Sequence, residues 1–123
     1  MPSFRVLFGV GLVLLVVGCD EPAGPKINAD GLRRIEPQPS YSSWWAEAQG
    51  CTGITASMDR ITWWLASRLP GSAVGVWVAP HDIVFLPEYH LVKTVVQHEM
   101  VHDLLQQGED AHQHRCFESL RDG

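Results

Sequence analysis

The segment His98-Glu99-Met100-Val101-His102 constrains the fold of this chain most strongly, because it puts three ionisable side chains inside an apolar run. Apolar residues cover much of the helix circumference, which predicts a buried helix: Val95, Val96, Met100, Val101, Leu104 and Leu105. On a helix, residues four apart lie one turn apart on the same face, so both imidazoles can reach one ion. Buried histidines and a buried glutamate need partners, and a metal ion with its water would supply them.

The same five residues form an HExxH motif, in which two histidines bind zinc and the glutamate acts on a water molecule. Glu99 lies next to the face of the two histidines, where it can deprotonate a water on the metal. The alternative is a helix in which two histidines one turn apart pair with Glu99 and bind no ion. Asp103, directly after the motif, is expected either to accept a hydrogen bond near the site or to face water.

Short apolar segments before the motif predict a small sheet. Strands are expected over residues 61–65, 74–79 and 83–86, with turns at Pro70-Gly71 and Pro80. A first helix is expected over 41–50, and the motif helix from 88 or 91 to 107, with Gly108 as its C-terminal cap. The tryptophan pairs at 44–45 and 63–64 are expected in the core. The predicted fold class is therefore α+β, with a small mixed or antiparallel sheet packed on the motif helix.

This order of helix, small sheet and HExxH helix resembles a minimal zincin-type zinc metallopeptidase, of the small kind found as bacterial lipoproteins, over residues 41–123. The resemblance implies Zn²⁺ as cofactor, Glu99 as the catalytic base and a peptide or protein as substrate. It also implies a strand at the sheet edge that pairs with an extended substrate, and residues 83–86 are the expected edge. Four residues stay open as the oxyanion donor: Tyr41, His81, Tyr89 and His90.

A catalytic zinc takes three protein ligands and keeps one position for water, so a third ligand is expected after the motif. His112 is the expected ligand, because Gly108 lets the backbone reverse after the helix. Phe117 and Cys116 can then hold the tail in place. His114 is the alternative third ligand, and Glu109 and Glu118 fit the arrangement less well.

The N-terminus predicts export and a lipid anchor. Residues 1–18 contain one charged side chain, Arg5, and an apolar run that is short for a bilayer span, as in a signal peptide. The sequence Val16-Val17-Gly18-Cys19 resembles the lipobox of bacterial lipoproteins, which implies cleavage before Cys19 and lipidation of its sulfur. An ordinary cleaved signal peptide is the alternative. Residues 19–40 contain four prolines and predict a flexible tether, followed by the folded domain, 41–123.

The cysteine count agrees with export to the bacterial cell envelope, where the chain would be anchored to the membrane and face the periplasm or the exterior. With Cys19 lipidated, Cys51 and Cys116 form an even pair and predict a disulfide. On the chain-entropy model, a bridge closing so long a loop contributes about 4 kcal/mol. The alternative is two buried free thiols.

Composition narrows the function classes. The formal net charge is −5, and the tether pair Arg33-Arg34 is the one basic cluster, which argues against nucleic-acid binding. Three classes stay open: a membrane-tethered zinc peptidase acting on envelope proteins or peptides, a non-catalytic zinc-binding lipoprotein (a scavenger or an inactivated zincin), and an envelope interaction module. Glu99 favours the peptidase, because metal binding alone needs no carboxylate beside the first ligand. A domain this short also leaves room for a protein partner that completes the cleft.

Overall fold

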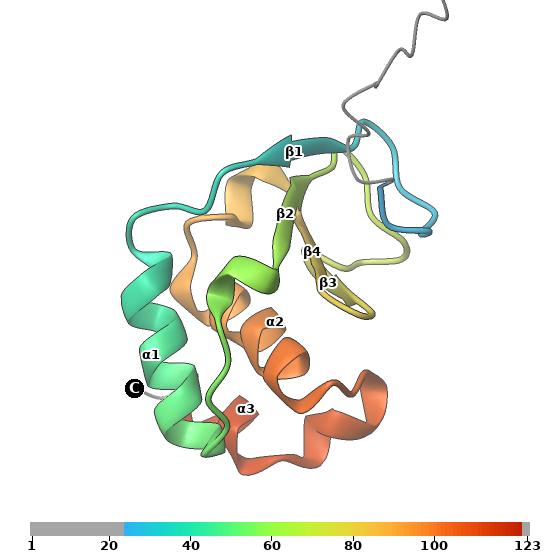
Figure 1. The fold of residues 1–123 in the computed structure, drawn as a ribbon. Helices are drawn as coiled ribbons and strands as arrows, with labels where there is room; N and C mark the ends of the chain where they lie inside the picture. The colour runs from blue at the N-terminus through green and yellow to red at the C-terminus, as the bar shows by residue number, and fades with distance from the viewer. Residues whose placement is uncertain (1–23, 122–123) are drawn as a thin grey trace, which may run out of the picture.

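The computed structural model describes residues 24–121, and its helices and strands confirm the α+β class (Figure 1). In this part of the chain, three α-helices accompany one four-stranded sheet. The helices are α1 (Tyr41–Thr52), α2 (Lys93–Leu105) and α3 (Arg115–Ser119), and the strands are β1 (Arg33–Ile35), β2 (Thr62–Leu65), β3 (Gly75–Val78) and β4 (Asp82–Phe85). Three short 3₁₀ helices connect them: η1 (Met58–Arg60), η2 (Pro87–Tyr89) and η3 (Glu109–Gln113).

The sheet is mixed, with the strand order β1-β2-β4-β3. Strand β4 pairs in parallel with β2 and antiparallel with β3, and β1 adds to β2 antiparallel. The strand expected over 83–86 therefore lies inside the sheet, and its prediction as the substrate-binding edge is wrong. Within the described chain, β3 forms the edge on this side of the sheet.

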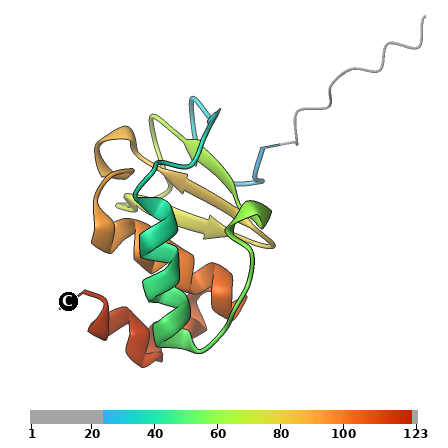
Figure 2. The same cartoon turned by 60° about the vertical axis from the view of Figure 1, so that its left-hand side comes forward.

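All three α-helices lie on one side of the sheet, with α1 and α2 side by side (Figures 1 and 2). Because side chains alternate along a strand, Trp63 and Leu65 of β2 point toward the helices, as do Ile83 and Phe85 of β4. They meet apolar residues of the helices in one core: Tyr41, Trp45, Ala48, Val96, Met100, Val101 and Leu104. Three of the four paired tryptophans, Trp45, Trp63 and Trp64, are buried, as expected from the sequence.

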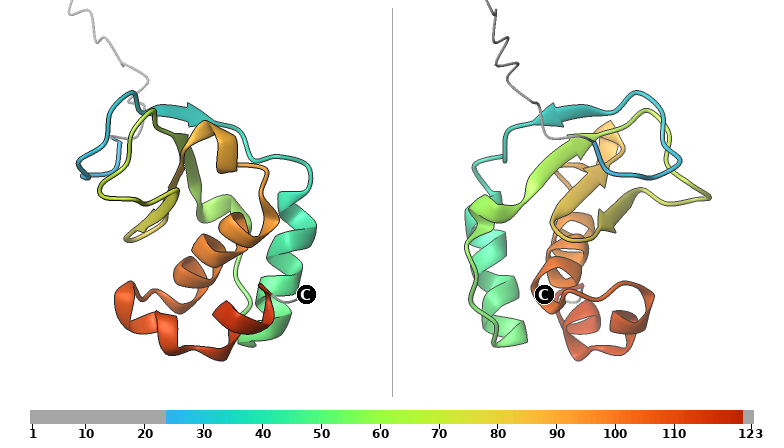
Figure 3. Two further views of the ribbon diagram at one scale, coloured as in Figure 1. Left: turned by 180° about the vertical axis from the view of Figure 1, so that it is seen from behind. Right: turned by 45° about the vertical axis from the view of Figure 1, so that its right-hand side comes forward.

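The opposite face of the sheet is covered by residues that were expected to form a tether. Trp64 and Val84 point to this face, where Ile27, Ala29 and Leu32 pack against them. The covering segment lies beside the loop after β2 (Figure 3). The carboxylate of Asp30 accepts from Arg68 Nε at 2.7 Å and holds the two segments together. The domain boundary predicted at Tyr41 is therefore wrong: residues 27–40 belong to the fold and supply β1.

Among residues 24–121, no helix is both long and apolar enough to cross a membrane. The predicted signal peptide, residues 1–18, and the predicted lipidation site, Cys19, lie outside the described residues.

Candidate metal centre

Helix α2 carries the HExxH motif through the middle of the domain. Its apolar face, with Val96, Met100 and Val101, is buried in the core and fixes the rotation of the helix. The helix starts at Lys93, later than predicted, because η2 occupies residues 87–89. It ends at Leu105, and Gln106, with φ 52°, takes the left-handed conformation that was predicted for Gly108.

Three histidines converge on one point. The Nε2 atoms of His98 and His102 lie 3.2 Å apart, and His112 Nε2 lies 3.2 Å from the first and 2.9 Å from the second. Two imidazole nitrogens bound to one tetrahedral zinc at about 2 Å would be about 3.3 Å apart. The three nitrogens therefore fit a single metal ion, and each is a known metal-ligand atom.

The chain reaches His112 by turning directly after the motif helix. The turn at Gln106 leads into η3, which carries His112 back over α2. His114, the alternative ligand, lies outside the histidine cluster: its Nδ1 accepts from the backbone N–H of Cys116 at 3.1 Å and caps α3. Of the two tail histidines, the structure thus brings His112 to the motif.

Neighbouring groups orient the imidazoles. His102 Nδ1 lies 2.8 Å from the carbonyl oxygen of Gln107, so Nδ1 donates and Nε2 keeps its lone pair for an ion. His112 Nδ1 lies 3.5 Å from a carboxylate oxygen of Glu109. The ring of Phe117 packs against all three imidazoles, with centroid distances of 4.7, 4.8 and 5.3 Å. Phe117 therefore holds the tail as expected from the sequence.

Burial keeps the motif histidines uncharged. Burial is the main cause and the neighbouring His102 and His112 act in the same direction, so that the pKa of His98 is lowered to about 4. Burial also lowers the pKa of His102. Both imidazoles are thus neutral at pH 7, as metal ligands must be.

Glu99 is buried beside the three histidines, with 5% of its surface exposed. Burial raises the pKa of its carboxyl group to about 8, while a hydrogen bond from the backbone N–H of Trp77 acts in the opposite direction. A carboxyl group with a pKa near 7 can both take and return a proton at neutral pH. A divalent cation at the histidines would lower this pKa, because an opposite charge favours the ionised form.

Two cavities adjoin these groups. The smaller, about 180 Å³, is lined by all three histidines, by Glu99 and by Gly75 to Trp77 of β3. The larger, about 380 Å³, shares His98 and Glu99 with the smaller one. The rest of its wall is mainly apolar: Ala73, Val74, Val95, Phe117 and Leu120.

Strand β3 runs along these cavities with one row of backbone groups turned toward them. The carbonyl of Val74 accepts from the N–H of Leu86 at 3.0 Å, so alternate residues of β3 bond to β4. The backbone groups of Gly75 and Trp77 therefore point to the free edge. A side chain at Gly75 would come within 3.1 Å of both Phe85 and Val95, so glycine lets the strand lie close to α2.

The disulfide predicted between Cys51 and Cys116 is present, with 65 residues between them in sequence. It joins the C-terminal end of α1 to α3, the helix that carries Phe117. The covalent bond thus holds one wall of the larger cavity against the body of the domain.

The four residues left open as oxyanion donors do not line either cavity. The hydroxyl of Tyr41 is buried and donates to the carbonyl oxygen of His90, and burial raises the pKa of this phenol. His81 lies beside Asp103, and His90 Nδ1 contacts the carbonyl of Pro87 at 2.6 Å. Tyr89 ends η2, before the motif helix.

Two contributors to the site escaped sequence reasoning, Trp77 and the carbonyl of Gln107, and Glu109 was considered only as a third ligand. Glu109 stands three residues before His112, a spacing from which their pairing could have been inferred. Trp77 and the Gln107 carbonyl left no such signal, because their roles depend on tertiary contacts and on the left-handed turn.

Compared with models of known families, with curated proteins and with solved structures, the chain gives no match.

Proposed function

We propose that this chain is a zinc-dependent peptidase. The observation that carries the proposal is the convergence of the Nε2 atoms of His98, His102 and His112 beside a buried glutamate and an open strand edge. Three imidazoles leave a fourth tetrahedral position open, which is the arrangement of catalytic rather than structural zinc sites.

His98, His102 and His112 would hold the ion. When bound, zinc supplies a Lewis acid that polarises a carbonyl and lowers the pKa of a coordinated water toward about 7. Glu99 would take the proton from the attacking water and deliver it to the leaving amine. The hydrogen bond from Trp77 would hold the carboxylate in place for both transfers.

The substrate would bind as an extended chain along β3, where the backbone groups of Gly75 and the carbonyl of Trp77 are turned to the free edge. The larger cavity would receive a side chain next to the cleaved bond. Its volume of about 380 Å³ and its apolar wall suit a large apolar side chain such as leucine or phenylalanine.

We further propose that the enzyme works at the bacterial cell envelope on envelope proteins or peptides. The signal-like segment 1–18 and the lipobox-like sequence before Cys19 support a lipid anchor, and the Cys51–Cys116 disulfide agrees with an oxidising compartment. Labelling cells with a radioactive fatty acid tests this part: native chain should be labelled and Cys19→Ala should not.

The main alternative is a zinc-binding lipoprotein without catalytic activity, either a scavenger or an inactivated zincin. The same three histidines would bind the zinc of such a protein, but the buried carboxyl group of Glu99 beside them would then have no role. Burying such a group is costly, which favours the peptidase.

The test combines zinc content with cleavage of a peptide library by the full-length protein in detergent. We expect one zinc per chain and cleavage by the native chain; Glu99→Gln should retain the zinc and lose cleavage. Glu88→Gln, at an exposed glutamate of η2, is the matched control and should behave as native. Bound zinc without cleavage would favour the scavenger, and absence of zinc would refute both.

The apolar cavity has its own test within the same assay. Leu120→Phe narrows the cavity, so cleavage next to large apolar residues should fall relative to cleavage next to alanine, with zinc retained. Leu91→Phe adds the same bulk at a residue that is 56% exposed, and it should leave the preference unchanged.

A further inference from the structure

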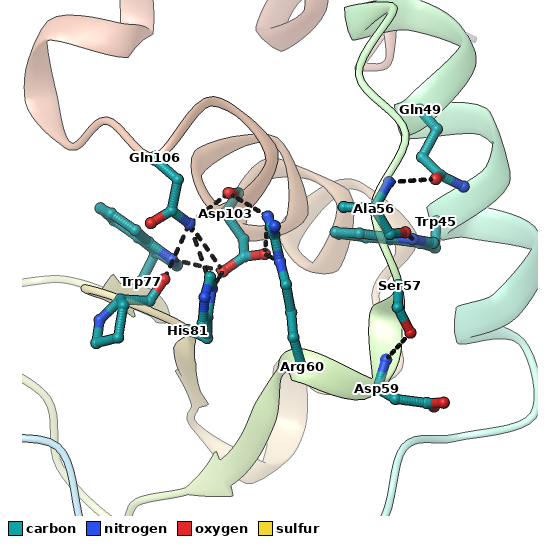
Figure 4. A network of polar contacts seen from close by, with 11 residues as sticks. Trp45, Gln49, Ala56, Ser57, Asp59, Arg60, Trp77, His81, Asp103 and Gln106 are labelled. Atoms are coloured by element: carbon teal, nitrogen blue, oxygen red, sulfur yellow. Dashed lines mark hydrogen bonds and ion pairs between the residues drawn. The ribbon is translucent and has the colours of Figure 1, made fainter.

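Asp103, the residue after the second motif histidine, is fully buried and is shared by three other segments of the chain (Figure 4). Its Oδ2 accepts from Arg60 Nε at 2.8 Å and pairs with Arg60 Nη2 at 2.7 Å. Its Oδ1 accepts from Trp77 Nε1 at 3.1 Å and lies 2.9 Å from His81 Nδ1. One carboxylate thus ties α2 to η1, to β3 and to the turn between β3 and β4.

Trp77 connects this carboxylate to the catalytic groups proposed above. Its indole donates to Asp103, its backbone N–H donates to Glu99, and its ring lies parallel to that of His102 at 6.2 Å between centroids. The contact with Asp103 therefore sets where β3 lies against the motif helix. A shift of β3 would move both the partner of Glu99 and the ring beside His102.

Gln106 connects Asp103 to the other side of His102. A left-handed backbone is unfavourable for a residue with a side chain, and here two hydrogen bonds of that side chain offset the cost. Gln106 Nε2 donates to the carbonyls of Asp103 at 2.7 Å and of Pro80 at 2.9 Å. The turn so held places the Gln107 carbonyl on His102 Nδ1.

We propose that Asp103 is a positioning residue of the metal centre. Through Trp77 it places the edge strand against Glu99 and His102, and through Gln106 it closes the turn that orients the His102 ring. Asp103 itself contacts no Nε2 atom of the three histidines. The inference rests on the metal-binding part of the proposed function, and it extends that part to a residue outside the HExxH motif.

The test replaces Trp77 by Phe, which removes the indole donor but keeps a ring beside His102 and the backbone N–H to Glu99. The matched control is Trp64→Phe, which removes an equivalent indole bond, from Trp64 Nε1 to Asp82 at 2.9 Å, on the opposite face of the sheet. Zinc affinity is measured by chelator competition, and ligand geometry by the visible absorption of the cobalt-substituted full-length protein.

We expect Trp77→Phe to weaken zinc binding, on the order of tenfold at most, and to shift the cobalt bands. Asp103→Asn should do the same more strongly, because an amide has one acceptor oxygen and cannot accept from both Arg60 and Trp77. Trp64→Phe should leave both measurements as in the native chain. Gln106→Gly keeps the left-handed turn but removes the side-chain hydrogen bonds. It tests the same inference if Asp103→Asn does not fold, and it should also shift the cobalt bands.

A purely structural role predicts a different pattern. If Trp77→Phe and Gln106→Gly lose thermal stability but keep the native zinc affinity and cobalt spectrum, the positioning role is refuted. It is also refuted if Trp64→Phe changes the spectrum as much as Trp77→Phe does. A native chain that binds neither zinc nor cobalt would instead refute the metal centre itself, and this inference with it.

Discussion

The backbone N–H of Trp77 donates a hydrogen bond to the carboxylate of Glu99. The edge strand of the sheet and the motif helix thus meet at the group that we propose as the base. This bond favours the ionised carboxylate, whereas burial favours the protonated acid, and burial is the larger effect. Because these two effects oppose each other, the protonation state of Glu99 depends on pH and on any cation beside it.

Glu99 should make the stability of the metal-free protein depend on pH. Its pKa is about 8 in the folded state against 4.5 as the reference value, so its stabilising contribution is complete below pH 4.5 and is lost as pH rises to about 8. Glu99→Gln cannot ionise, so at pH 9 it should be more stable than the native chain, by roughly 1–4 kcal/mol. Urea unfolding of both proteins at pH 5, 7 and 9, with a chelator present, measures the difference.

His98 acts in the opposite direction on the acid side. Its pKa is lowered from 6.5 to about 4, so the stability that it contributes is present above pH 6.5 and is lost as pH falls toward 4. Comparing the stability of the native chain with that of Glu99→Gln above pH 6.5 therefore isolates the contribution of Glu99. Identical pH dependence of the native chain and Glu99→Gln in that range would contradict the assigned burial of the carboxyl group.

Zinc should stabilise the protein through His112 and not through His114. At free zinc one hundred times the dissociation constant, the native free energy of unfolding should rise by about 2.7 kcal/mol, and a chelator should reverse the gain. His112→Asn should lose most of this gain. His114→Asn should keep it, because asparagine also caps a helix N-terminus, as His114 does for α3. Thermal unfolding of both variants with and without zinc checks this prediction. If His114→Asn loses the gain and His112→Asn keeps it, His114 is the ligand.

The Cys51–Cys116 disulfide should contribute a large share of the stability. Replacing both cysteines by alanine should lower the free energy of unfolding by about 2–5 kcal/mol, since the unfolded chain is no longer constrained. A reductant should lower the stability of the native chain by a similar amount and leave the double variant unchanged. Equal stability of the native and double-variant proteins in urea would show that the bond is dispensable.

Residues 27–40 should be required for folding. A chain that starts at Tyr41 lacks β1 and exposes Trp64 and Val84, whereas a chain that starts at Gly24 keeps both features. We expect the shorter chain to bind a hydrophobic dye and to unfold without a cooperative transition, because an apolar sheet face is left open. If both chains unfold in urea at the same midpoint, the revised domain boundary is wrong.

Local pattern was enough to predict the motif helix, the disulfide and three of the strands. The buried helix follows from apolar residues around much of its circumference, and the cysteine pairing follows from the even count left once Cys19 is expected to be lipidated. The position of His112 followed from a reversal of the backbone after α2, although the turn occurs at Gln106 rather than Gly108. The reason is that side-chain hydrogen bonds compensate the left-handed backbone of Gln106, which the sequence does not display.

Strand order and the first strand were beyond local pattern. Arg33 and Arg34 stand among prolines and show no apolar alternation, so β1 forms because β2 offers it an edge. The edge strand was assigned to 83–86, although the continuous apolar run Ile83 to Leu86 is typical of an interior strand. Trp77 was missed as a site residue because its partners, Glu99 and Asp103, are more than twenty residues away in sequence.

The three imidazoles come from one short stretch of chain, and the last two are ten residues apart. Closing so small a loop costs little entropy. If the proposed ion binds, we therefore expect its coordination to be an early step of folding, which joins the motif helix to its own tail before β3 packs beside them. On the proposed function, a zinc-poor medium would then yield fewer folded molecules, in addition to any loss of turnover by each.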